Sequence, residues 1–210
     1  MKITVLGAGN MGAAFVKQLT RAGHQVSVAS KGGTKASQVA AANPGAKAVL
    51  ADGAAAGADV VVLATGFADA VAALQAAGDL KGKVVVDITN PLTADYMGLT
   101  IGHSTSAAEE IAKVVPGAEV VKAFNTLFAQ VLEGGADFGG GQKLSVFVAS
   151  DSERAKQSAV ALAESMGFQV VDAGGLKNAR YLEPLAGLNI YLGYGAGLGT
   201  VIAPAWISKA

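Results

Sequence analysis

The chain has 210 residues and carries 16 basic and 16 acidic side chains, so its formal net charge is zero at neutral pH. This balance argues against nucleic acid or an anionic membrane surface as the main partner, because both attract clustered positive charge. The sequence contains no cysteine, which excludes disulfide bonds, a thiolate nucleophile and a zinc–thiolate site.

The most specific pattern in the sequence lies in residues 1–13. An apolar, β-favouring run (residues 3–6) precedes an amphipathic stretch (residues 13–21), and between them three glycines satisfy the pattern G-x-G-x-x-G. In this pattern the first glycine permits a tight turn, the second lets a pyrophosphate approach the backbone, and the third lets the helix pack on the strand. The N–H groups at the start of that helix would face the phosphates. We therefore expect a dinucleotide to contact Gly7, Ala8, Gly9, Asn10, Met11 and Gly12.

The residues after the second predicted strand (residues 25–29) indicate which dinucleotide is bound. A site that prefers NAD places an Asp or Glu about 20 residues after the glycines. This chain has no carboxylate there, and instead has Ser30, Lys31 and Lys35. A hydroxyl and ammonium groups suit the 2′-phosphate of NADP(H) through charge-assisted hydrogen bonds. The sequence predicts NADP(H) as cofactor, with a solvated lysine loop as the alternative.

Strand-like and helix-like segments alternate along the rest of the chain. This order predicts an α/β fold, namely a Rossmann-type doubly wound, mostly parallel sheet with right-handed crossovers. We expect a single NADP-binding domain over residues 1–210, in which residues 176–210 form a small C-terminal helical extension. The further strands are expected at residues 48–50, 59–65, 83–90, 119–125, 144–150 and 169–173.

The ends of these strands supply further candidate cofactor-binding residues, since ligands of open α/β sheets bind beyond the carboxyl ends of the strands. Asn90 could hold the nicotinamide, although a pure turn role before the proline explains it equally well. Phe67 could lie beside the adenine or ribose, or simply pack in the core. The candidates at these ends are Ala64, Thr65, Gly66, Asn90, Pro91, Ala123, Phe124 and Asn125.

No catalytic acid or base stands out, so the catalytic residues are unknown, and no metal cluster is expected. His24 and His103 have no charged partner nearby in the sequence, and a helix-capping box explains Ser106 and Glu109. Reduction of a ketone or oxidation of a hydroxy acid would need an acid or base. Hydride transfer between two ring cofactors mainly needs alignment of the reacting carbons. The sequence therefore favours transfer from one ring cofactor to another.

Residues 185–208 contain no charged side chain, and an uncharged stretch of this length raises the possibility of a membrane span. Asn189, Pro204 and five glycines interrupt this stretch. We expect instead a buried helix or a homodimer interface, with Gly195 and Gly199 one turn apart on a helix. Because residues 1–2 run directly into the first strand, no secretory signal peptide is expected, and a cytoplasmic location follows.

Residues 7–12, 30–31, 106–109, 120–125 and 172–183 together resemble the NADPH-dependent coenzyme F420 reductase (F420H2:NADP oxidoreductase-like) family, which is related to the cytosolic ferric-reductase domains of STEAP proteins. The resemblance implies NADP(H) held by the glycine loop, Ser30 and Lys31. It also implies a nicotinamide near Thr65, Asn90 and residues 123–125, with a deazaflavin or flavin opposite, near the C-terminal helices. The family often has an arginine where Lys31 stands, and lysine keeps the charge but loses bidentate binding.

The acceptor and the physiological direction stay open at this point. Coenzyme F420, FMN, FAD, a quinone or a ferric chelate all fit the sequence. Two other functions also remain. A dehydrogenase of the 3-hydroxyacid or 6-phosphogluconate type shares the glycine pattern but has a long helical second domain, whereas only about sixty residues follow Ser150. The other is a non-enzymatic NADP(H) sensor module.

Overall fold

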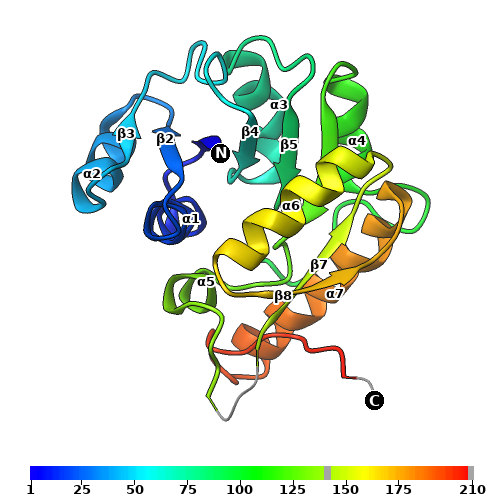
Figure 1. Ribbon diagram of the computed structural model, residues 1–210. Helices are drawn as coiled ribbons and strands as arrows, with labels where there is room; N and C mark the ends of the chain where they lie inside the picture. The colour runs from blue at the N-terminus through cyan, green and yellow to red at the C-terminus, as the bar shows by residue number, and fades with distance from the viewer. Residues whose placement is uncertain (140–142, 208–210) are drawn as a thin grey trace.

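The computed structural model describes residues 1–139 and 143–207, which form an eight-stranded sheet with helices on both faces (Figure 1). The strand order is β3-β2-β1-β4-β5-β6-β7-β8. The strands are β1 (Lys2–Leu6), β2 (Gln25–Ala29), β3 (Lys47–Ala48), β4 (Val60–Leu63), β5 (Val84–Asp87), β6 (Glu119–Ala123), β7 (Ser145–Ala149) and β8 (Gln169–Asp172). The helices are α1 (Asn10–Arg21), α2 (Thr34–Ala42), α3 (Phe67–Ala76), α4 (Ala107–Val114), α5 (Ala129–Gly134), α6 (Glu153–Ser165), a 3₁₀ turn (Leu176–Asn178), α7 (Ala179–Ile190) and a π turn (Tyr191–Gly195).

The order of the first six strands is the Rossmann order, so the predicted fold class is confirmed. Six of the seven strand pairs are parallel, and β6 and β7 are antiparallel. The prediction of right-handed crossovers throughout is wrong at this pair. After β6 the chain passes through α5, which the sequence did not reveal, and β7 then runs back along β6.

Side chains that alternate along the central strands build two separate cores. Val5, Val62 and Val86 belong to the core on the face covered by α1 and α6. Their neighbours Val61 and Val85 belong to the core on the face covered by α3 and α4. Figure 1 shows α6 crossing the front of the sheet and α7 lying behind β7 and β8. Burial on both faces explains why these strands are continuous apolar runs.

The C-terminal extension is helical only in its first part. Helix α7 and the π turn end at Gly195, and residues 196–207 form no regular structure. Gly197 and Gly199 have φ angles of 74° and 80°, which belong to the left-handed region and break a helix. The prediction that Gly195 and Gly199 lie one turn apart on a helix is therefore wrong. Residues 208–210 lie outside the described residues. Within residues 1–139 and 143–207, no helix has the length and hydropathy needed to cross a membrane.

Candidate active site

The three glycines of the loop between β1 and α1 have different surroundings. A Cβ atom on Gly7 would lie 2.3 Å from the carbonyl oxygen of Ala64, and one on Gly12 would lie 1.9 Å from the carbonyl oxygen of Gly7. A Cβ atom on Gly9 would meet nothing within 4 Å. Gly7 and Gly12 are thus required by internal packing, whereas Gly9 borders open space. Helix α1 has no acidic residue in its first turn, so its N-terminus suits a phosphate.

The loop between β2 and α2 is a second place that suits an anion. Ser30 Oγ accepts a hydrogen bond from the Ala36 backbone N–H at 3.0 Å, so this hydroxyl holds the start of α2 and still has a proton to donate. Gly32 and Gly33 both have a φ angle of 75°, which turns the chain into the helix. Lys31 and Lys35 are exposed beside this turn. The geometry fits the 2′-phosphate that the sequence predicts, and the structural role of Ser30 was not foreseen.

At the carboxyl edge of the sheet, Asn90 and Asn125 lock the ends of two strands together. Asn90 Nδ2 donates to the Asn125 carbonyl oxygen, and Asn125 Nδ2 donates to Asn90 Oδ1, each at 2.9 Å. Asn125 Nδ2 also donates to the Leu182 carbonyl oxygen at 2.9 Å. Asn90 therefore does more than form a turn, because it joins the end of β5 to the end of β6 and, through Asn125, to α7. The neighbouring Pro91 is buried.

Two of the candidate residues at the end of β6 point into the core. Ala123 and Phe124 are fully buried, and Phe124 packs edge-to-face on Phe15, with ring centroids 5.1 Å apart. Their side chains are therefore unable to contact a cofactor. Phe124 has a φ angle of 60°, an uncommon conformation for an aromatic residue. The packing of its ring holds this turn, which directs the next residue, Asn125, toward Asn90.

Among the candidate residues after β4, three form a loop beside the glycine loop and one packs in the core. Ala64, Thr65 and Gly66 form the loop that begins beside Gly7 and ends at the N-cap of α3. Phe67 begins α3 and packs against the core, which favours the packing alternative over stacking on the cofactor.

A cleft of about 240 Å³ lies where these strand ends meet α1, α7 and the π turn. Its walls bring together residues more than 180 positions apart in the sequence, from Asn10 to Tyr194. Its lining includes Asn10, Met11, Asn90, Leu92, Tyr96, Asn125, Thr126, Phe128, Ala186, Asn189, Ile190 and Tyr194. Among the described residues, none that lines this cleft is acidic, basic or histidine. A cleft of this size suits part of a ring system rather than a whole dinucleotide.

Several buried polar atoms at this edge have no hydrogen-bond partner within the described part of the chain. Asn125 Oδ1 and Thr126 Oγ1 belong to residues that line the cleft, and Thr65 Oγ1 lies in the loop after β4. Buried polar groups in proteins are almost always paired, so these atoms fit a site whose partner is a ligand or ordered water. Thr126 directly follows Asn125, the last of the predicted strand-end residues. This position is the only signal in the sequence that could have identified Thr126 as part of the site. Asn189 and Tyr194 gave no such signal.

The remaining residues considered from the sequence lie away from the cleft. Ser106 Oγ accepts from the Glu109 backbone N–H at 3.2 Å, which confirms the predicted N-cap. The Glu109 carboxylate, however, bonds the Ser106 hydroxyl at 2.8 Å and Arg180 of α7 at 2.7 Å rather than completing the capping box. The hydrogen bond from Arg180, followed by that from Ser106, lowers the pKa of Glu109 against the opposing effect of burial.

Neither histidine takes part in this site. His103 is exposed on its loop. His24 contacts Ser165 Oγ at 2.9 Å, and burial followed by the nearby N-terminal ammonium lowers its pKa. His24 precedes β2, and its Nδ1 lies 3.3 Å from the N-terminal amine of Met1, just before the start of β1. The histidine thus lies toward the amino edge of the sheet, opposite the cleft. No group of three or more His, Asp or Glu residues that could hold a metal occurs within residues 1–139 and 143–207.

The Rossmann order, the open glycine loop and the cleft at the carboxyl edge define a dinucleotide-binding protein. Residues 2–91 match the family model described as "NADP oxidoreductase coenzyme F420-dependent". The F420-dependent NADP reductase of Methanothermobacter marburgensis is 32% identical over 209 residues, which cover 91% of this chain and 92% of that protein. The chain therefore belongs to the F420-dependent NADP reductase family.

Two further comparisons agree with this family. A crystal structure from Arthrobacter sp. FB24, whose proposed activity is F420-dependent NADP reduction, is 35% identical and superposes with a TM-score of 0.84, covering 95% of this chain and 96% of that one. Metalloreductase STEAP3 of Rattus norvegicus is 30% identical over 185 residues, which cover 88% of this chain. The chain spans only 36% of the length of STEAP3, so the similarity covers one part of that protein.

Proposed function

We propose that this protein transfers a hydride between NADP(H) and a deazaflavin of the coenzyme F420 type. One observation carries the proposal. The cleft joins the start of α1 to the ends of β5 and β6, and its described lining has polar amides and aromatic rings but no charged or histidine side chain. Such a lining can align two rings, whereas reduction of a simple ketone would need a proton donor. The family relationship supports the same reaction.

The residues of this chain divide the binding of NADP(H) among three loops. The glycine loop would hold the pyrophosphate at the start of α1, with Gly9 giving it room. Ser30, Lys31 and Lys35 would hold the 2′-phosphate. Thr65 and the amides of Asn90 and Asn125 would face the nicotinamide end. When both substrates are bound, NADPH supplies the hydride, and the acceptor ring takes it together with one proton from solvent.

The acceptor would enter between aromatic side chains on the outer side of the cleft. Tyr96 and Tyr194 are each 61% exposed and both line the cleft. Phe128 packs edge-to-face on Tyr194 with ring centroids 5.7 Å apart, which fixes one wall. Aromatic walls with a polar rim suit a flat, polar-edged ring such as a deazaflavin. FMN, FAD, a quinone and ferric chelates are the competing acceptors.

The experiment that tests this function follows NADPH absorbance with coenzyme F420, FMN, FAD, menadione and ferric citrate as acceptors. We expect rapid oxidation of NADPH with coenzyme F420 and slow oxidation with the others. Faster turnover with a flavin, a quinone or ferric citrate would contradict the deazaflavin assignment. NADPH binding without oxidation by any of them would show a binding module instead of an enzyme, and exclusive turnover of a hydroxy acid would also overturn the proposal.

The choice of NADP(H) over NAD(H) can be tested at Lys31. Replacing Lys31 by alanine removes an exposed ammonium beside the turn after β2. The loss should be about 1.5–3 kcal/mol, the range for hydrogen bonds to charged groups, or about ten- to hundredfold weaker NADPH binding. Calorimetric titration with NADPH and NADH separates the roles, because only NADPH has the 2′-phosphate. Equal losses for both cofactors would contradict the assignment, and Lys47→Ala, on the edge strand β3, is a matched control.

We also propose that the protein is a cytoplasmic homodimer that pairs through its C-terminal segment. In support, large apolar side chains are exposed there, namely Tyr191 (51%), Leu198 (61%), Val201 (64%), Trp206 (70%) and Ile207 (91%). Exposed apolar clusters of this kind often mark protein–protein contacts. The location follows from the proposed substrate, because NADPH is produced and used inside cells.

A further inference from the structure

Three charged side chains are buried among the described residues, and they contact one another. Lys122 of β6 lies opposite Asp87 of β5 in the parallel register, and Glu183 comes from α7. All three side chains are at most 1% exposed. Lys122 Nζ lies 2.7 Å from Asp87 Oδ2 and 2.8 Å from Glu183 Oε1. None of the three lines the cleft, and the proposed hydride transfer does not use them.

Every polar atom of this buried cluster has a partner. The third hydrogen of Lys122 is donated to the Thr89 carbonyl oxygen at 2.6 Å, and Asp87 Oδ1 accepts from the Thr89 N–H at 2.8 Å. Two carboxylates and one ammonium leave one negative charge in excess. That charge meets the start of α4, where the N–H groups of Ala107 and Ala108 donate to Glu183 at 2.8 and 3.2 Å. The helix dipole stabilises an anion at this position.

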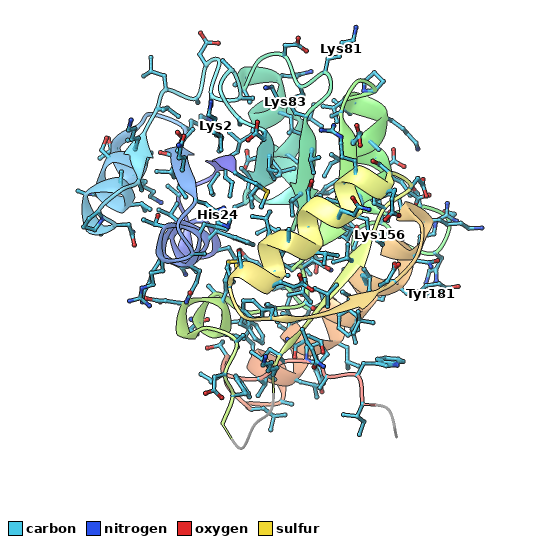
Figure 2. All side chains as sticks on the ribbon, in the orientation of Figure 1. Lys2, His24, Lys81, Lys83, Lys156 and Tyr181 are labelled. Atoms are coloured by element: carbon cyan, nitrogen blue, oxygen red, sulfur yellow. The ribbon has the colours of Figure 1, made fainter. Side chains whose placement is uncertain are left out.

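The cluster holds α7 at the point where the helix begins to form the cleft. Leu182, adjacent to Glu183, accepts the hydrogen bond from Asn125. One and two turns further on, Ala186 and Asn189 line the cleft, and Asn189 Nδ2 donates to the Thr126 carbonyl oxygen at 3.1 Å. Tyr181, two residues before Glu183, points outward at the right of Figure 2 and is 74% exposed. Glu183 is therefore the inward-facing anchor of this helix.

Stability alone does not account for such a cluster. Apolar side chains of similar volume often replace a buried ion network without loss of stability, because the desolvation of buried charges is costly. Apolar contacts, however, tolerate sliding and rotation of a helix, whereas a fully paired network permits one arrangement. The best-supported use of buried charges is to specify such a register. Here α7 carries Ala186 and Asn189 of the cleft wall, so the register of this helix determines where these two residues lie.

We propose that Glu183, with Lys122 and Asp87, is a positioning residue that sets the place of α7 and so aligns the acceptor with the nicotinamide. This inference rests on the proposed hydride transfer to a deazaflavin. It assigns Glu183 no contact with either substrate. The shape of the cleft depends on the buried charges, whereas the binding of NADPH at the glycine loop does not.

The test compares the wild type with Glu183→Gln. This variant should lower kcat/KM for coenzyme F420 by about ten- to hundredfold, because a displacement of the acceptor ring on the order of 1 Å slows the reaction by that much. The Kd of NADPH, measured by calorimetry, should stay unchanged. Hydrogen exchange should become faster at the α7 amides after residue 183 and stay unchanged in α1. Unchanged exchange in α7, or an equal loss of NADPH binding, would overturn the proposal.

Two further variants distinguish positioning from stability. Arg180→Gln removes the partly exposed ion pair between the first turn of α7 and Glu109 of α4. This variant leaves the buried cluster intact and should leave kcat/KM unchanged. The triple variant Asp87→Leu, Lys122→Met, Glu183→Leu should melt no lower than Glu183→Gln and still turn over coenzyme F420 poorly. Recovery of wild-type kcat/KM by this apolar variant would overturn the proposal. If the wild type itself does not oxidise NADPH with coenzyme F420, the proposed function fails, and the hydrogen-exchange comparison still tests the positioning of α7.

Discussion

At the scale of single residues, the site depends on side chains and glycines whose roles differ although they look alike in the sequence. Gly7 and Gly12 lie so close to backbone atoms that a Cβ would collide with them, whereas Gly9 faces open space. Asn90 and Asn125 both end strands, yet they act as a pair, each bonding the other. Phe124 stands between the strand and Asn125 and holds the turn from within the core.

The different surroundings of the glycines lead to a prediction for two single substitutions. Gly9→Ala should leave the melting temperature of the free protein unchanged, because its Cβ would meet no atom within 4 Å and its φ of −78° suits alanine. It should weaken NADPH binding about ten- to hundredfold if it displaces the phosphate from the N–H groups. Gly12→Ala should also destabilise the free protein by about 1–3 kcal/mol, the range for overpacking. Thermal melts and calorimetry check both, and equal melting temperatures for the two variants would contradict this assignment.

At the scale of elements, α7 joins the cleft to the rest of the fold. It bonds the strand end at Asn125, the buried Lys122 and, through Arg180, the first turn of α4. The contacts at Asn125 and Lys122 lie next to the part of α7 that lines the cleft, whereas the Arg180 pair lies in the first turn of the helix and adds stability rather than position. Within this attachment, the hydrogen bond from Arg180 lowers the pKa of Glu109, which makes the contribution of this ion pair to stability depend on pH.

The Glu109–Arg180 pair predicts a pH-dependent contribution to stability. The pKa of Glu109 is lowered in the folded protein, mainly by the hydrogen bond from Arg180. A lowered pKa means that the stabilisation is complete above the unfolded-state value, about 4.3, and is lost as pH falls through the folded-state value. Glu109→Gln should lower the melting temperature at pH 7 by about 2–4 °C, for a contribution of about 1 kcal/mol. The difference from wild type should shrink as pH falls below the unfolded-state value and should disappear below the lowered folded-state pKa of Glu109.

Melting curves between pH 3 and pH 8 measure this difference. Glu164→Gln is the control, because Glu164 is an exposed residue of α6 and belongs to neither α4 nor α7. A difference between wild type and Glu109→Gln that is the same at pH 3 and pH 7 would show that the ion pair is not its source.

At the scale of the whole molecule, the residues after α7 present apolar side chains on an irregular chain. Trp206 is the only tryptophan of the sequence, is 70% exposed, and packs edge-to-face on Phe147. If two copies pair through this segment, the tryptophan should become less exposed as they associate. Its fluorescence therefore reports on the proposed dimer.

The homodimer can be tested by sedimentation velocity together with tryptophan emission over a range of protein concentrations. We expect dimers, and an emission maximum that moves to shorter wavelength as the protein associates. Leu198→Asp with Val201→Asp should shift the equilibrium to monomer by placing unpaired charges in the interface. Leu50→Asp, at an exposed position (79%) beside the amino edge, should have no such effect. A monomer at every concentration would contradict the proposal.

The sequence by itself determined the fold class and the place of the dinucleotide loop. These depend on local signals, namely apolar runs of strand length, glycines at fixed spacing, and Ser30 and Lys31 where a carboxylate would otherwise stand. A glycine loop between a strand and a helix has few alternative structures, so its geometry can be predicted without knowledge of distant residues.

Only the tertiary structure decided which residues meet at the cleft. Asn125 meets Leu182 across 57 positions, and Glu183 meets the start of α4 across 76. Phe124, with a φ angle of 60°, turns into the core, whereas its neighbour Asn125 lines the cleft. The buried charges of Asp87, Lys122 and Glu183 are tolerable only because they meet, and no local pattern records that meeting.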